Sequence, residues 1–106
     1  MRRFIATAVL CLSAFGAHAG GYTAPGKLVS VQIWPAHNGV LVQHQNMVNP
    51  DGCIRTDQFI LRPSDPFFKE MYAMLLSALA SNKQVQLHVS GCEQNFPIVT
   101  VTASFN

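Results

Sequence analysis

The sequence predicts a small β-rich α+β fold, with five strands and one short helix between the third and the fourth. Three features of the chain support this prediction: segments in which apolar and polar residues alternate, one stretch with apolar residues three and four positions apart, and turn-forming residues between them. The 106 residues suit a single domain and contain no internal repeat. We therefore expect one folded domain behind a targeting segment.

The first 19 residues have the layout of a secretory signal peptide. A basic start precedes an apolar run, and the run ends at the small-x-small motif Ala17-His18-Ala19. A transmembrane helix is the alternative, but the run from Phe4 to Ala17 is shorter than the ~20 residues that such a helix needs. We expect cleavage after Ala19, no membrane insertion, and export to the periplasm or the extracellular medium.

Cleavage of the predicted signal peptide would remove the formal net charge of the chain. The full sequence carries a formal charge of +2, and the loss of Arg2 and Arg3 brings the exported part to neutrality. A neutral protein has no electrostatic reason to bind nucleic acid or an anionic membrane. We expect neither partner.

Two cysteines remain in the exported part, Cys53 and Cys92. An oxidising compartment predicts a disulfide between them, which stabilises the domain by roughly 4 kcal/mol in the chain-entropy model. A redox-active pair would need close Cys-x-x-Cys spacing or a basic neighbourhood that lowers a thiol pKa, and neither is visible. The bond is therefore expected to be structural.

The exported part begins with an arm over residues 20–26, whose glycines and proline favour turns. The folded domain is predicted to span residues 27–106, and its first strand ends at Trp34. Apolar residues alternate along that strand, which places one set toward the core: Val29, Val31 and Ile33.

A hairpin turn is predicted after the first strand. Pro35 stops strand pairing, and Asn38-Gly39 is typical of a tight turn, so residues 40–44 fold back as the second strand. A polar loop leads from there to a third strand around the apolar residues 59–61.

The stretch from residue 67 to residue 80 predicts the helix. Asp65 is placed to cap its first turn, Pro66 suits its first position, and Asn82 suits a left-handed end. Other apolar residues flank its main stripe, so the helix is also a candidate surface for self-association unless the sheet covers both stripes. The residues of the main stripe are Phe68, Met71, Tyr72, Leu75, Leu76 and Leu79.

Two strands complete the domain, at residues 84–89 and 98–105, with a polar connection between them. This order of elements is that of a small, partly open five-stranded barrel of the oligonucleotide- and oligosaccharide-binding (OB) type. An open sheet with the helix across one face uses the same order and remains an alternative. In the last strand the following residues are expected on one face: Val99, Val101, Ala103 and Phe105.

The loops that join strands one to two and four to five commonly carry the ligand of an OB-type barrel. Carbohydrate or peptide binding requires an aromatic face and amides in a shallow site. The alternative for Trp34 is that it packs under its turn as part of the core, and Asn38 is also explained by turn geometry alone. The candidate ligand-binding residues in the two loops are Trp34, His37, Asn38, Gln94, Asn95 and Phe96.

Neither catalysis nor a cofactor is expected. No nucleophile is accompanied by a recognisable base, and both exported cysteines are assigned to the disulfide. The histidines of the exported part are His37, His44 and His88, and with Met47 they lack the spacing of a copper or zinc site. We therefore predict no metal ligands and no enzymatic activity.

The residues on both sides of the helix resemble a family of small secreted bacterial proteins. Gly52-Cys53, the apolar strand at residues 59–61, the Pro-led helix and the segment from Ser81 to Cys92 are similar to those of proteins related to the binding subunit of subtilase cytotoxin. This resemblance implies a five-stranded barrel that binds sialylated glycans and assembles as a ring, here through the helix or the sheet edges. It transfers no glycan-contacting residue to this chain. Many shorter relatives stand alone, so a standalone structural or inhibitory protein without a glycan ligand is the alternative function.

Overall fold

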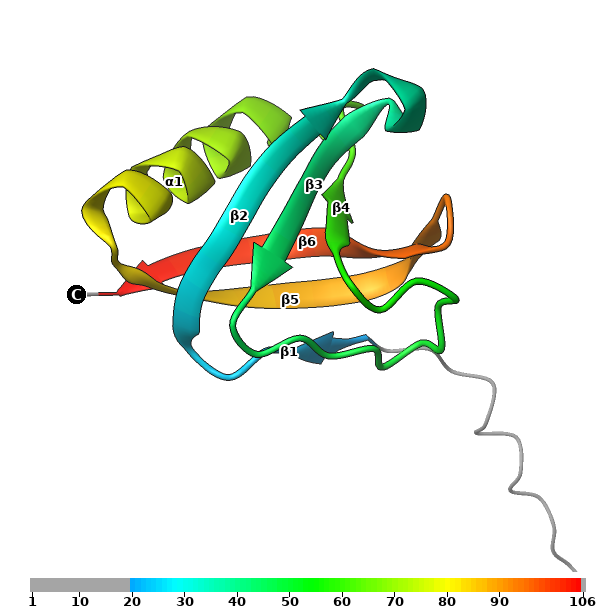
Figure 1. Cartoon of the computed structure of the whole chain (residues 1–106), viewed down its shortest axis with the longest axis horizontal. Coiled ribbons are helices and arrows are strands. Elements are labelled where there is room, and N and C mark those ends of the chain that lie inside the picture. The colour runs from blue at the N-terminus through cyan, green and yellow to red at the C-terminus, as the bar shows by residue number, and fades with distance from the viewer. Residues whose placement is uncertain (1–19, 106) are drawn as a thin grey trace, which may run out of the picture.

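The structure, a computed structural model, describes residues 20–105 (Figure 1). The predicted signal peptide at residues 1–19 lies outside this range, as does Asn106. Within it, no helix is long and apolar enough to cross a membrane. The elements are β1 (Gly21–Tyr22), β2 (Gly26–Trp34), a 3₁₀ turn (Pro35–His37), β3 (Gly39–His44), β4 (Phe59–Leu61), α1 (Phe68–Ser81), β5 (Gln84–Glu93) and β6 (Phe96–Phe105).

The six strands of this region form one sheet in the order β1-β5-β2-β3-β4-β6, and β5 also pairs with β6. The pairings therefore lead from β5 through β2, β3, β4 and β6 back to β5. Most of the pairs are antiparallel, whereas β4 and β6 run parallel through Ile60 and Ile98. A β-rich α+β fold with its helix between the strands at residues 59–61 and 84–93 is thus confirmed.

The predicted strand count of five is too low, because residues 20–26 contain β1. Tyr22 pairs with His88 in β5, and their two rings meet edge to face with 4.7 Å between centroids. Thr23 is buried: its N–H donates to the Leu87 carbonyl (2.8 Å), and the N–H of Leu87 donates to its hydroxyl oxygen (3.1 Å). The segment is therefore an integral part of the sheet.

The connection between the last two strands is shorter than predicted. The polar residues 90–93 continue β5, and β6 already begins at Phe96. Gln94 and Asn95 form a two-residue turn with φ values of 52° and 72°. Positive φ at both positions is what a type I′ hairpin turn requires, and Asn is one of the residues that tolerate it.

A bulge overturns the predicted faces of β2. The register with β3 shifts between Leu28 and Ser30, and an additional residue at this point reverses the side on which the preceding side chains lie. Leu28 is therefore buried, whereas Val29 is 57% exposed. Val31 packs against the core, but Ile33 is 64% exposed at the hairpin end. Only Val31 of the three predicted core residues fulfils that prediction.

A second bulge divides the predicted apolar face of β6. Val89 pairs with Val99, but the preceding residue His88 pairs with Val101, so Thr100 is the additional residue. Val99 is fully buried, whereas Val101 and Phe105 are exposed. The prediction that all the odd-numbered positions share one face is wrong for this reason.

The C-terminal end of the helix is confirmed, but its start and its buried face differ from the prediction. Asn82 terminates α1 with a left-handed φ of 58°. The Asp65 carboxylate accepts the N–H of Phe67 (2.9 Å), but Phe67 is itself the N-cap and has no side-chain cap bond, so Asp65 does not cap α1 and Pro66 lies outside it. Leu75 is fully buried, whereas Leu76 is 41% exposed and Leu79 is also exposed. A single stripe centred on Leu75 faces the sheet, so the predicted face was too broad.

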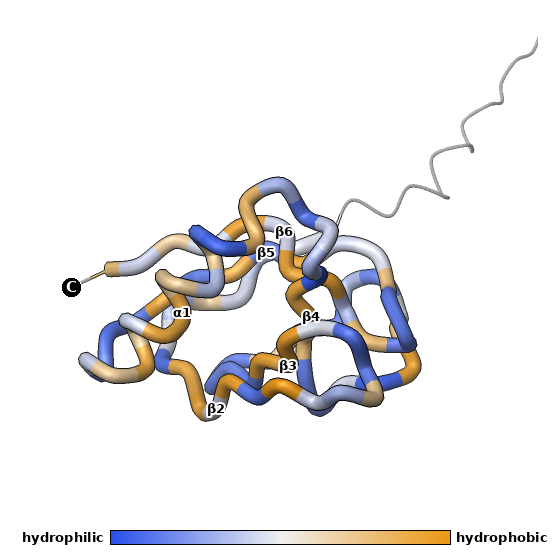
Figure 2. Tube along the Cα trace, turned by 90° about the horizontal axis from the view of Figure 1, so that it is seen from above, coloured by the Kyte–Doolittle hydropathy of each residue, from blue (hydrophilic) through white to orange (hydrophobic). Residues whose placement is uncertain are grey.

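The core lies where α1 and the strands surround a central region (Figure 2). A smaller apolar cluster lies beyond the main core, because β3 and β4 have buried residues on both faces. This small cluster consists of Leu41, Ile60, Phe96 and Ile98. The main core consists of Leu28, Val40, Val42, Phe59, Leu61, Met71, Leu75, Ala78, Val85, Leu87, Val89 and Val99.

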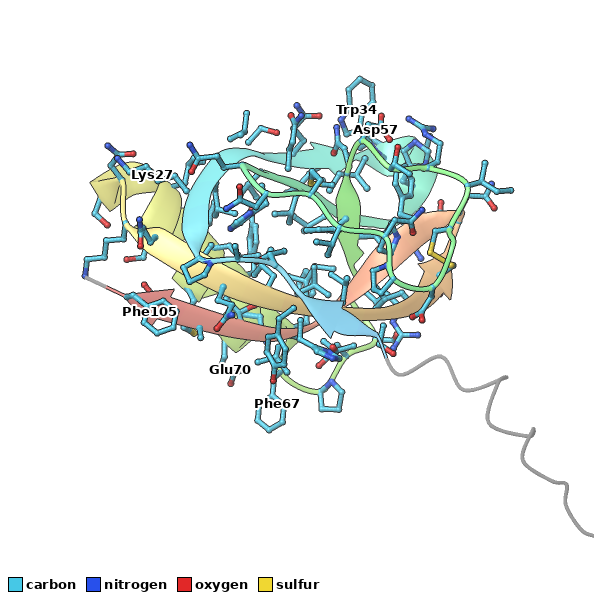
Figure 3. All side chains as sticks on the ribbon, turned by 90° about the horizontal axis from the view of Figure 1, so that it is seen from below. Lys27, Trp34, Asp57, Phe67, Glu70 and Phe105 are labelled. Carbon is cyan, nitrogen blue, oxygen red and sulfur yellow. A yellow bond between two sulfur atoms is a disulfide. The ribbon has the colours of Figure 1, made fainter. Side chains whose placement is uncertain are left out.

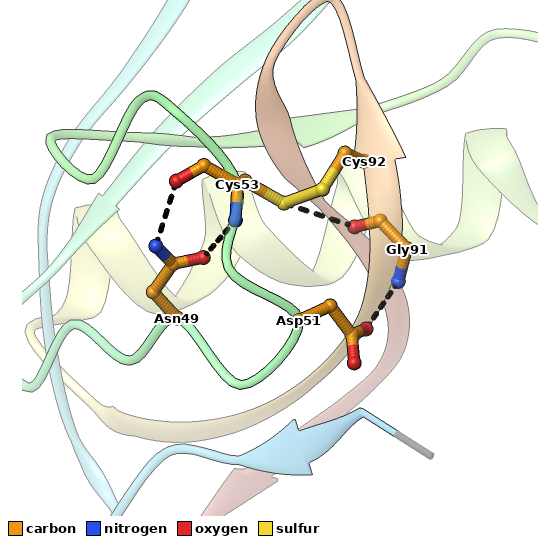
Figure 4. Close-up of a disulfide and its surroundings, with 5 residues drawn as sticks. All are labelled: Asn49, Asp51, Cys53, Gly91 and Cys92. Carbon is orange, nitrogen blue, oxygen red and sulfur yellow. Dashed lines mark hydrogen bonds between the residues drawn. A yellow bond between two sulfur atoms is a disulfide. The ribbon is translucent and has the colours of Figure 1, made fainter. Parts of the chain in front are cut away.

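The predicted disulfide between Cys53 and Cys92 is confirmed, with the two Cα atoms 5.7 Å apart. It ties the loop between β3 and β4 to the end of β5 (Figure 4). The Asn49 side chain bonds both the N–H and the carbonyl of Cys53 at 2.8 Å, and the Asp51 carboxylate accepts the N–H of Gly91 at 2.6 Å. The loop is therefore tied to β5 at two points, the disulfide and the Asp51–Gly91 bond, and is braced internally by Asn49.

His44 is a buried structural residue rather than an exposed strand histidine. Its Nε2 donates to the carbonyl of Val85 (2.9 Å), and its Nδ1 accepts the N–H of Asn46 (2.9 Å). Both ring nitrogens are thus satisfied by the Nε2–H tautomer. The side chain links the end of β3 to β5.

Replacement of His44 by alanine should lower the free energy of unfolding by about 3 kcal/mol, because it removes buried packing and leaves two backbone groups without their partner. Urea denaturation followed by circular dichroism measures the loss. His37→Ala is the matched control, since His37 is less buried, and it should change stability by less than about 1 kcal/mol. Equal losses in the two variants would contradict the structural role of His44.

Candidate ligand-binding site at the hairpin ends

The ends of the β2–β3 and β5–β6 hairpins lie against each other. The Nδ1 atom of His37 is 3.3 Å from the Oε1 atom of Gln94, although the two residues are 57 positions apart. The side-chain amide of Gln94 also donates to the backbone carbonyl of His37. The His37 ring meets the Phe96 ring edge to face, with 5.4 Å between centroids. The two loops chosen from the sequence therefore form one continuous surface.

Arg55 and Asp57 border this surface from the loop before β4. The N–H of Arg55 donates to the Asn95 carbonyl (2.8 Å), and its guanidinium lies 4.9 Å from the centre of the Phe96 ring. The same guanidinium donates to both carboxylate oxygens of Asp57, at 3.2 and 2.9 Å. We call His37, Arg55, Asp57, Gln94 and Asn95 the polar rim.

The hydrogen bond from Arg55 lowers the pKa of the Asp57 carboxyl below its ordinary value, and the bond to Asp57 raises the pKa of Arg55. Because the folded-state pKa of Asp57 is lowered, the ion pair persists as the pH falls until it passes that lowered pKa. Over the pH range in which Asp57 is ionised, the polar rim therefore presents the Arg55–Asp57 ion pair, which has no net charge. Sequence reasoning missed both residues, although two opposite charges two positions apart stand out in a chain with so few charges.

Phe96 supports the rim from below. It is 1% exposed and belongs to the small cluster with Leu41, Ile60 and Ile98. Its ring lies beside His37 and Arg55, so it has no open face on which a ligand could stack. Of the six candidate ligand-binding residues, Phe96 therefore has a structural role in packing beneath the rim.

Trp34 is not a core residue, because it is 52% exposed and its ring projects away from the molecule (Figure 3). Its Nε1 donates to the Oε1 atom of Gln32 at 2.6 Å, which fixes the indole on the strand. Asn38 ends the 3₁₀ turn in the left-handed conformation (φ 47°), so turn geometry accounts for asparagine at this position. Both residues also line a pocket.

This apolar pocket has a volume of about 360 Å³ and lies between the β2–β3 hairpin and the start of α1. Phe68 and Tyr72 of the helix stack with 5.8 Å between centroids and an interplanar angle of 15°. The sequence assigned these two rings to the packed helix face, and nothing local indicates that they would meet Trp34. The lining residues are Ile33, Trp34, Pro35, Asn38, Gly39, Val40, Pro63, Phe68 and Tyr72.

The candidate residues are thus divided between two adjoining places. His37, Gln94 and Asn95 belong to the polar rim, whereas Trp34 and Asn38 belong to the apolar pocket. Within residues 20–105, no three His, Cys, Asp or Glu side chains are grouped closely enough to hold a metal ion. Comparison of the chain with models of protein families, with curated proteins and with solved structures found no match.

Proposed function

We propose that this chain is an exported, non-catalytic binding protein that recognises a glycan at the paired hairpin ends. The observation that carries the proposal is the contact between His37 and Gln94, which joins the hairpin that bears the exposed indole of Trp34 to the turn that bears the amides of Gln94 and Asn95. Sugars are bound by this combination, because their apolar faces stack on aromatic rings and their hydroxyls bond to amides. The disulfide is compatible with an exported protein.

The order of strand pairing supports an OB-like architecture for the domain. Five strands, β2 to β6, pair in a circuit, α1 lies between β4 and β5, and β1 is an addition to the edge of β5. The β2–β3 and β5–β6 turns then correspond to the two loops that commonly carry the ligand in OB-type barrels. The resemblance to the binding subunit of subtilase cytotoxin suggests a glycan ligand but points to no residue of this site.

Ring assembly belongs to the same proposal. The outer side of α1 leaves Leu76 and Leu79 exposed, Phe67 is exposed directly before the helix, and the only charged residues of α1 are Lys69 and Glu70. A second subunit would cover this apolar surface. Light scattering of the exported protein measures the assembly: a ring supports the relation to toxin binding subunits, whereas an inert monomer supports a standalone protein.

On a glycan array, Trp34→Ala should bind the preferred glycan at least tenfold more weakly than the wild type, because it loses the stacking surface. Phe105→Ala is the matched control, since Phe105 is also an exposed aromatic residue and lies at the end of β6 remote from the β5–β6 turn. This control should bind as the wild type does. Unchanged binding by Trp34→Ala would exclude the site, and a wild type that binds no glycan would exclude the glycan.

A further inference from the structure

The residues that line the apolar pocket disfavour the binding of a charged ligand. It contains three aromatic rings, two prolines and two aliphatic side chains, and no charged residue. The indole N–H of Trp34 is already donated to Gln32, which leaves the Asn38 amide and the Tyr72 hydroxyl as the polar side-chain groups. A charged or strongly polar group would lose its water here without replacing most of its hydrogen bonds. The occupant of the pocket is therefore neutral and apolar.

A peptide segment is a poor match for the same lining. Its backbone would need partners, but Pro35 and Pro63 have no N–H, and the strand residues of the pocket are paired across the hairpin, Ile33 with Val40 and Trp34 with Gly39. A sugar ring fits no better, because hydroxyls at most of its carbons would remain unsatisfied. A hydrocarbon chain needs no partner, and the flat Phe68–Tyr72 pair offers it a wall.

We propose that the apolar pocket binds the alkyl chain of an uncharged ligand. Its volume of about 360 Å³ is more than twice that of an engineered cavity of about 150 Å³ that holds one benzene molecule, which gives room for a chain of about eight carbons. This inference shares Trp34 with the proposed glycan site, but it does not require a glycan ligand. If both hold, the ligand is a saccharide that carries an alkyl or acyl chain.

Trp34 provides the measurement, because it is the single tryptophan of the chain and lines the pocket. The exported protein is titrated with 1-alkanols from butanol to decanol, and the indole emission is recorded. We expect a saturable blue shift as the chain displaces water from the ring. The dissociation constant should fall about fourfold with each methylene, from about 0.8 kcal/mol for each buried CH₂, and should level off near octanol.

Two variants of β2 locate the binding. Ile33→Glu introduces a carboxylate at a residue that lines the pocket, and Val29→Glu introduces the same group on the same strand outside the lining. Both positions are more than half exposed, so both variants should fold, which circular dichroism checks. We expect Ile33→Glu to weaken octanol binding more than tenfold and Val29→Glu to leave it unchanged.

Three results would overturn the proposal: no saturable shift with any alkanol, equal binding by Ile33→Glu and the wild type, or a blue shift that rises with protein concentration alone. The last result would mean that a second copy of the chain fills the pocket. The alkanols contain no sugar, so their failure leaves the glycan result intact, and an empty glycan array leaves the alkanol result intact. An octyl glycoside of any glycan found on the array should bind at least tenfold more tightly than the methyl glycoside.

Discussion

Replacement of both Cys53 and Cys92 by alanine should lower the free energy of unfolding by about 4 kcal/mol. The bond joins residues separated by 39 positions, so its removal releases a long loop in the unfolded chain. Single domains have total stabilities of about 5–15 kcal/mol, and small ones lie at the lower end. The expected loss is therefore a large share of the stability, and urea denaturation of the double variant measures it.

The wild-type protein with a thiol reductant is the matched comparison. It should lose as much stability as the double variant, while the same reductant should not affect the double variant. The native contacts of Asn49 with Cys53 and of Asp51 with Gly91 should survive, because they do not involve the sulfur atoms. A double variant within 1 kcal/mol of the wild type would refute the stabilising role of the bond.

In the monomeric domain, replacement of Leu75 by alanine should cost about 3–4 kcal/mol of stability, whereas the same change at the next residue, Leu76, should cost less than about 1 kcal/mol. Leu75 is fully buried in the main core, so its truncation leaves a cavity between α1 and the sheet. Leu76 is 41% exposed and leaves none. Both variants keep a good helix former, so helix propensity does not separate them.

The same urea denaturation experiment compares the two leucine variants. Similar losses for both would mean that α1 presents the broad face suggested by residue spacing, with Leu76 packed on the sheet or on another subunit. In that case the loss in Leu76→Ala would depend on protein concentration if a subunit interface were the cause.

The elements that could be predicted are those whose signals are local. Asn82 ends the helix because it tolerates the left-handed conformation, and Asn38-Gly39 marks its hairpin for the same reason. The disulfide could be predicted because Cys53 and Cys92 are the two cysteines outside the predicted signal peptide. Strand order suggested the two hairpin ends as candidate ligand-binding loops, and the contact between His37 and Gln94 shows that these ends lie together.

The features that could not be predicted depend on partners distant in sequence. The bulges at Val29 and Thr100 are properties of a strand and its neighbour, so the periodicity of one strand does not contain them. A two-residue strand such as β1 has no measurable period, so its sequence predicts only an arm around Tyr22. The apolar pocket forms between α1 and the β2–β3 hairpin, and the local sequence pattern of neither element predicts that they lie together.

The contact between His37 and Gln94, with Phe96 packed beneath it, would affect the thermodynamics of the proposed glycan binding. Both turns already have partners before any ligand arrives, so association does not have to order them. A preorganised site of this kind retains more of its contact energy as affinity and changes little in backbone shape on binding. The conformational entropy of ordering these two turns is lost once, during folding, and is not lost again each time a ligand binds.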